Sequence, residues 1–167
     1  MVKLIPGYHD SSLLGLVTQP HPPRALVLEL YGTGNAPNTK MALIELLRGA
    51  AEKDIVVAAC SQCKKGAVDF DAYAVGKAFA DAGVLPCLDM TVSPPTHRRR
   101  PRPPAGSRLV QTYARNGQVE ACVTKLSHLL AAYEGNAAMV RSLLATPLRG
   151  EISAREMYTV QQAAVCN

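Results

Sequence analysis

Two adjoining stretches, Ala25–Leu30 (ALVLEL) and Tyr31–Pro37 (YGTGNAP), decide the fold of this 167-residue chain. The first is apolar at five of its six positions, which is typical of a strand covered on both faces of a parallel sheet. The second is rich in turn-forming residues, and Asn38 or Thr39 after it can cap a helix whose leucines share one stripe. A strand, a glycine turn and a helix in this order predict one unit of a parallel α/β fold.

Similar patterns recur on both sides of this unit. Further strands are expected at Val2–Ile5, Ile55–Ala59 and Val84–Leu88, and further helices at Leu13–Leu16, Tyr73–Ala82, Val119–Leu130, Ala137–Leu144 and Ser153–Ala164. Asp10–Ser12 is expected to cap the first of these helices, and Gly83 to end the helix at 73–82. The chain is therefore predicted to be α/β, with a small parallel sheet of about four strands flanked by helices.

The glycine turn is the first candidate site. Ligands of open parallel sheets bind beyond the carboxyl ends of the strands, and Gly32 and Gly34 would let backbone N–H groups approach an anion there. The stretch does not fit a dinucleotide fingerprint, because Pro37 stands where a third glycine is needed. A tight turn without a ligand explains the same residues, and both interpretations stay open.

The second candidate is Cys60-Ser61-Gln62-Cys63, directly after a predicted strand. Redox CxxC pairs occur at such places, but they open a helix directly, whereas Lys64-Lys65-Gly66 intervenes here. A zinc site would need a second CxxC, and the four histidines show no ligand spacing. We therefore expect no metal and no cofactor.

The positive charge is concentrated in one segment, Ser93–Gln118. It holds six arginines, five of the twelve prolines and no acid, and removing it changes the net charge from +5 to −1. Such a segment could bind nucleic acid through phosphates, but with a single aromatic residue for stacking this partner is not expected. Five cysteines without a secretory signal indicate reduced thiols and a cytoplasmic location, and no apolar run is long enough for a membrane span.

Several pieces of the chain together resemble the C-terminal domain of type I (cytoplasmic) L-asparaginases. They are Val2–Gly7, Leu28–Pro37, Ser61–Cys63, Gly66–Val68, Tyr73–Gly76, Gly83–Val84, Asp89–Thr91, Val119–Ala121, Thr124–Leu126 and Leu148–Glu151. Their order and spacing are those of the family except between Thr91 and Val119. The resemblance implies a Rossmann/flavodoxin-like domain, approximately 1–155, of an enzyme that hydrolyses L-asparagine to L-aspartate and ammonia.

In this family the nucleophilic threonine and its activating groups lie in a larger N-terminal domain. The chain begins at the family's second domain, so we expect it to be inactive alone and to need that N-terminal domain, in a homo-oligomer when complete. The resemblance also assigns residues. Asn35 and Tyr73 would approach the substrate of a neighbouring subunit, and Ser61, Gln62 and Cys63 match a triplet that binds a regulatory asparagine. Glu29 stands where the bacterial enzymes have an arginine for that effector and would repel its carboxylate.

Residues 92–118 interrupt the resemblance. Excising them joins Thr91 to Val119 and restores the family's sequence, with Thr91 as a helix N-cap and Glu120 in the first turn. Codons for Val92 and Gln118 would carry the letters of an intron's two ends. We interpret 92–118 as a retained intron or a lineage-specific disordered insertion, and 156–167 as a tail or helix. A noncatalytic amino-acid-binding or assembly module is the alternative function.

Overall fold

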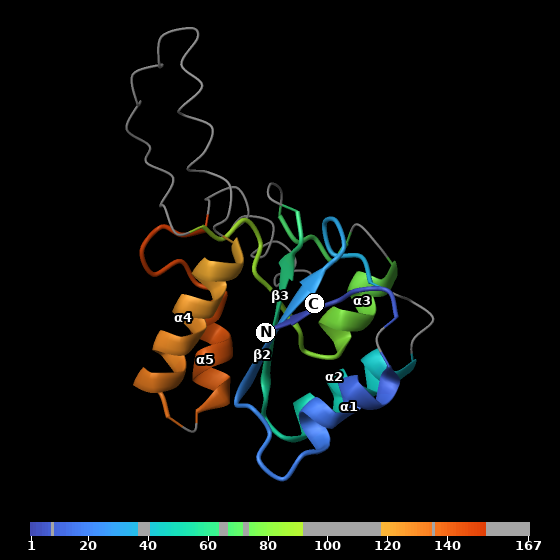
Figure 1. Cartoon of the computed structure of the whole chain (residues 1–167). Helices are drawn as coiled ribbons and strands as arrows, with labels where there is room; N and C mark the ends of the chain where they lie inside the picture. The colour runs from blue at the N-terminus through green and yellow to red at the C-terminus, as the bar shows by residue number, and fades with distance from the viewer. Residues whose placement is uncertain are drawn as a thin grey trace, which may run out of the picture.

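A four-stranded parallel sheet in the order β1-β2-β3-β4 forms the centre of the molecule (Figure 1). The computed structural model describes residues 1–7, 9–36, 41–63, 67–71, 74–91, 118–134 and 136–152. The strands are β1 (Val2–Lys3), β2 (Ala25–Leu30), β3 (Val56–Ser61) and β4 (Leu85–Pro86). The helices are α1 (Asp10–Thr18), α2 (Met41–Glu52), α3 (Ala74–Asp81), α4 (Gln118–Ala132) and α5 (Ala137–Leu144). The predicted α/β class is confirmed.

Helices cover both faces of the sheet, as near-continuous apolar strands require. In Figure 1, α1, α2 and α3 lie on one side and α4 and α5 on the other. Leu26, Leu28 and Leu30 of β2 belong to the core on the α1–α3 side. Val27 of β2 and Ala58 of β3 belong to the core on the α4–α5 side. Alternate residues of each central strand therefore hold the two helical layers together.

The two central strands pair over their whole length, from Ala25 opposite Val56 to Leu30 opposite Ser61. The outer strands are shorter than predicted, with two residues each. At β1, the chain turns away at Pro6-Gly7 and Ile5 is already half exposed. In β4, Pro86 has no N–H to donate to a backbone hydrogen bond of the sheet. Just after β4, Leu88 has a left-handed φ of 51°. Local turn chemistry therefore ends both outer strands early.

The helix bounds also differ in places from the predictions. Asp10 begins α1 instead of capping it, and His9 at the N-cap position makes no side-chain cap bond. The helix α5 has the predicted bounds, and Asn136 caps it by accepting the N–H of Met139 at 2.9 Å. Gly83, with φ of 75°, follows α3 as predicted. The predicted helix at 153–164, the tail at 156–167 and both N-cap candidates of α2 lie outside the described residues.

Across the part of the chain that the structure describes, every helix falls short of the length and apolar character that crossing a membrane requires.

Candidate functional site

The glycine turn at the carboxyl end of β2 closes on itself through two backbone hydrogen bonds. Tyr31 N–H donates to Asn35 O and Asn35 N–H donates to Tyr31 O, both at 2.8 Å. Gly32 and Gly34 have φ values of +53° and +132°, which side-chain-bearing residues rarely adopt. The loop therefore needs glycine at both places, and it holds the exposed Asn35 at the edge of the sheet.

The backbone of residues 67–71 lies against this turn. Asp69 N–H donates to Thr33 O at 2.7 Å, and a Cβ added at Gly34 would lie 3.2 Å from Asp69 O. Gly34 thus admits the chain's own backbone, so its role is explained without a bound anion. Asn35 Oδ1 accepts the N–H of Ala36 at 2.9 Å, which orients the side chain. Tyr73, the second predicted substrate-proximal residue, lies outside the described residues.

Ser61 and Gln62 connect the glycine turn to the neighbouring strand ends. The Ser61 hydroxyl donates to Gly32 O and accepts the N–H of Cys63 at 2.9 Å. Gln62 Nε2 donates to Leu4 O at 2.6 Å and to Glu29 O at 2.9 Å. Both side chains therefore hold backbone segments together at the carboxyl edge.

The four residues predicted for the regulatory site lie at the same edge of the sheet, but they differ in how far they are exposed to solvent. Glu29 is buried, and its carboxylate lies 3.7 Å from the exposed ammonium of Lys3. Cys63 is exposed. Ser61, whose backbone pairs opposite Leu30, and Gln62, which contacts the backbone of Glu29, lie between them. The edge thus presents a carboxylate and a lysine where the bacterial pattern has an arginine.

Gln118 is a contact that the sequence analysis missed. Its amide oxygen accepts the N–H of Ser61 at 2.8 Å, and its amide nitrogen donates to Leu88 O. Gln118, interpreted from the sequence as the last residue of the insertion, is the first residue of α4 in the structure. Residues 92–117 lie outside the described residues.

Three buried thiols meet below this edge, and sequence reasoning missed them too. Cys60 ends up beside Cys87, which follows β4, and Cys122 in α4, with the three sulfurs within 4.8 Å of one another. Hydrogen bonds from Cys60 and Cys87, aided by the charge of Lys125, lower the pKa of Cys122. The contact with Cys122, together with burial, raises the pKa of Cys60 and of Cys87. The other cysteine of the CxxC stretch, Cys63, is exposed and does not belong to this cluster.

Sequence signals for this cluster exist but are weak. Cys60 and Cys87 lie close to the ends of neighbouring parallel strands, and Cys87 N–H donates to Ala59 O at 2.9 Å. Residues near the carboxyl ends of two neighbouring parallel strands, such as β3 and β4, lie close together at the same edge of the sheet. Cys122 could not be added from sequence, since it depends on how α4 docks.

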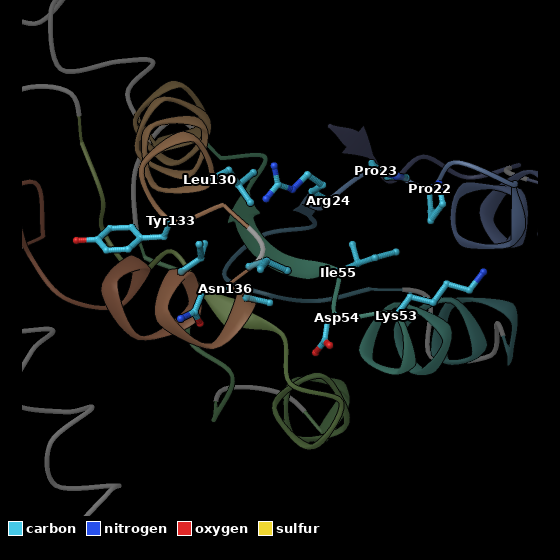
Figure 2. Close-up of a pocket in the computed structure, with 12 residues that line it drawn as sticks. Pro22, Pro23, Arg24, Lys53, Asp54, Ile55, Leu130, Tyr133 and Asn136 are labelled. Carbon is cyan, nitrogen blue, oxygen red and sulfur yellow. The ribbon is translucent and has the colours of Figure 1, made fainter.

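A hollow of about 210 Å³ lies at the opposite edge, where the strands begin (Figure 2). Arg24 and Ile55, which precede β2 and β3, line it together with Tyr133 and Asn136. Asn136 already serves as the cap of α5. Because ligands of such sheets bind beyond the carboxyl ends, this hollow is not the candidate site.

Comparison with known proteins decides the family. Residues 1–94 match the glutaminase/asparaginase C-terminal domain. The chain belongs to the glutaminase/asparaginase C-terminal domain family. L-asparaginase 1 of Escherichia coli is 33% identical to this family member over 153 residues, which cover 92% of the chain and 36% of that relative. The human 60 kDa lysophospholipase is also 33% identical over 153 residues, covering 92% of the chain and 21% of that protein.

Solved structures of asparaginases share the fold of this domain. L-asparaginase I from Vibrio cholerae superposes with a TM-score of 0.65 at 28% identity, over 91% of this chain and 36% of that one. The thermostable L-asparaginase from Thermococcus kodakarensis gives a TM-score of 0.66 at 25% identity, over 92% of this chain and 37% of that one. The chain thus spans little more than a third of the length of each of these asparaginases.

Proposed function

We propose that this domain acts as the C-terminal part of an L-asparaginase, which hydrolyses L-asparagine to L-aspartate and ammonia. The similarity to asparaginases over more than nine tenths of the chain carries the proposal. In this proposal an N-terminal domain supplies the attacking hydroxyl, since acyl transfer needs an activated nucleophile and an oxyanion site. The C-terminal domain supplies subunit contacts and residues next to the substrate of a partner, in a homo-oligomer of cytoplasmic location.

Asn35 is the residue that this proposal places next to the substrate. Its carboxamide can both donate and accept hydrogen bonds, which suits the amide and charged groups of asparagine. The closed turn between Tyr31 and Asn35 supports this role, because it presents the exposed side chain on a rigid loop. Tyr73, which lies outside the described residues, has the same proposed role.

Ammonia release in the presence and absence of an N-terminal asparaginase domain tests the proposal. The 167-residue chain alone is expected to release none from L-asparagine, and the mixture to release it. Asn35→Ala should lower the rate of the mixture about tenfold, the value of one lost hydrogen bond to substrate. The exposed Gln19, which directly follows α1, provides the control. Gln19→Ala should leave the rate unchanged. Ammonia release by the chain alone, or an Asn35→Ala mixture at the full rate, would contradict the proposal.

A regulatory asparagine site at Glu29, Ser61, Gln62 and Cys63 is a second proposal for this edge. Gln62 and Ser61 are engaged with backbone groups, and the Glu29 carboxylate would repel the effector's carboxylate. Lys3 is the cation beside Glu29 that could oppose this repulsion. Calorimetry with L-asparagine on the chain alone tests both this site and the alternative of a noncatalytic amino-acid-binding module. If L-asparagine binds to the chain alone and Lys3→Ala abolishes this binding, the result would favour the noncatalytic amino-acid-binding module.

We also propose that 92–118 is an insertion into the family's sequence. The family match supports this, because it ends at residue 94, just after the point where the insertion begins. Sequencing the mature transcript distinguishes a retained intron from a translated insertion. A message that keeps these codons would exclude the intron.

A further inference from the structure

The three-thiol cluster is built from separate parts of the fold and is enclosed by it. Cys60 comes from β3, Cys87 from the segment after β4, and Cys122 from the first turns of α4. Their exposed fractions are 0%, 1% and 0%. The sulfurs of Cys87 and Cys122 are 2.9 Å apart, and all three lie within 4.8 Å of one another. The proposed asparaginase activity uses none of these thiols.

These separations are close to those that one metal ion imposes on three sulfurs. With metal–sulfur bonds of about 2.3 Å, three thiolates arranged in a plane around an ion lie about 4 Å apart. To reach that spacing, the sulfurs of Cys87 and Cys122 would move about 1 Å further apart. Any two sulfurs that are now as far as 4.8 Å apart would move less than about 1 Å closer together. Side-chain rotations cover such shifts, so the backbone can keep its place.

The donor set selects the kind of metal. Among the described residues, no histidine or carboxylate completes the group to four, and structural zinc sites nearly always have four ligands. Soft thiolates suit Cu(I), zinc and iron–sulfur clusters. A set of three leaves Cu(I) among these, because iron–sulfur clusters, like structural zinc, are normally held by four ligands. We propose that Cys60, Cys87 and Cys122 bind one Cu(I) ion. Each thiol that coordinates the ion releases its proton to solvent, and no electron is transferred.

The surroundings contribute positive potential to a site that becomes anionic. Cys122 is the fifth residue of the 15-residue helix α4. Lys125, one turn further along α4, acts on Cys122 electrostatically, whereas Glu29 opposes a charge on Cys60. The bound ion would connect β3, the end of β4 and α4 directly below Ser61 and Gln118. Metal binding is therefore expected to stabilise the candidate-site edge.

Anaerobic titration of the reduced full chain with Cu(I), against a chromophoric Cu(I) chelator, tests the proposal. One equivalent should bind, the Tm should rise, and X-ray absorption should show three sulfurs at about 2.3 Å. Cys60→Ser, Cys87→Ser and Cys122→Ser, each checked for folding by circular dichroism, should each weaken binding at least tenfold. The double variant C63S/C166S keeps the three thiols and should bind like the unaltered chain.

Several results would overturn the proposal: absence of Cu(I) binding by the reduced chain, binding that the three serine variants retain, or fewer than three sulfurs around the ion. Tighter binding of Zn²⁺ than of Cu(I) at the same cysteines would overturn the assignment of the metal. A Cys87–Cys122 disulfide that survives treatment with reductant, found by peptide mapping, would also overturn the proposal, because two of the three thiols are then not available to a metal ion. These results are independent of ammonia release, so the asparaginase proposal stands or falls separately.

Discussion

Gly76 and Gly15 both lie inside helices, but only Gly76 is pressed against another segment. A Cβ at Gly76 would overlap the backbone of Phe70, whereas a Cβ at Gly15 would have nothing within 4 Å. Gly76→Ala should therefore destabilise the domain by about 2 kcal/mol or more, because the helix α3 must move away from the backbone of Phe70. Gly15→Ala should stabilise it by about 0.5–1 kcal/mol, since alanine is the better helix former.

Urea unfolding of both alanine variants measures these changes. Both substitutions add one methyl group to a helix. Opposite changes in the free energy of unfolding would therefore isolate the effect of the contact between Gly76 and the backbone of Phe70. A neutral Gly76→Ala variant would show that α3 can move from Phe70 without loss, and it would contradict the packing of the two segments.

Local sequence predicts a residue's role where the cause is itself local. Gly83 is predicted to end α3 because its positive φ suits glycine, and the structure confirms this. Asp10–Ser12 also looks like a cap, yet the helix begins at Asp10 and His9 stands at the N-cap without a side-chain cap bond. The roles of Gln118 and Gly34 depend on contacts with distant segments, which no local pattern contains.

At the scale of elements, one buried ion pair joins α4 to the segment after α5. Lys125 Nζ lies 2.7 Å from the Glu151 carboxylate and donates to Leu144 O at 2.8 Å. Lys125→Met should destabilise the domain by about 1–3 kcal/mol, because the Glu151 carboxylate loses its cation and keeps only the N–H groups of Leu148 and Arg149. Lys125→Met combined with Glu151→Leu should recover most of that loss, since the uncompensated charge is then gone. Urea unfolding measures both, and the exposed Lys77→Met serves as the control.

The same pair predicts how stability depends on pH. Burial would raise the pKa of Glu151, but hydrogen bonds from Lys125 and the N–H groups of Leu148 and Arg149 outweigh it and lower the pKa from 4.5 to about 2. Since the folded pKa is the lower one, this carboxylate stabilises the fold above pH 4.5, and its contribution is lost as the pH falls towards 2.

Unfolding of Glu151→Gln and of the unaltered chain between pH 7 and pH 2 tests this dependence. The difference in free energy of unfolding should be constant above about pH 5 and should shrink steadily below it. A difference that does not change over this range would contradict the lowered pKa of Glu151.

Elements are predictable to the extent that their own residues determine their burial. The apolar runs of β2 and β3 predict both central strands, and β3 extends to Ser61 because its pairing with Leu30 continues. The outer strands are shorter than their apolar runs, because the turn at Pro6-Gly7 ends β1 and the backbone at Pro86 and Leu88 ends β4. The thiol cluster needs the docking of α4 on the sheet, so the cysteine spacing in the sequence, which fits neither a redox pair nor a zinc site, does not reveal it.

At the scale of the whole molecule, the two ends of the proposed insertion are attached to the same edge. Thr91 N–H donates to Glu151 O at 2.9 Å, and Gln118 contacts both Ser61 and Leu88. If 92–118 adds no packed structure, its removal relieves a loop-closure cost of up to about 3 kcal/mol. It also removes the two Gln118 hydrogen bonds, which contribute about 1 kcal/mol each. Deleting 92–118 should therefore leave the domain folded and at least as stable.

A matched deletion of 92–117 keeps Gln118 and separates the two effects. It should exceed the 92–118 deletion in free energy of unfolding by about 1–2 kcal/mol, because Ser61 N–H and Leu88 O retain their side-chain partner. Urea unfolding of both variants and of the unaltered chain gives the comparison, with circular dichroism to check the helices. If either deletion unfolds the domain, 92–117 belongs to the folded structure and the insertion proposal is wrong. Equal stability of the two deletions would instead show that the Gln118 contacts are replaced when Thr91 joins α4 directly.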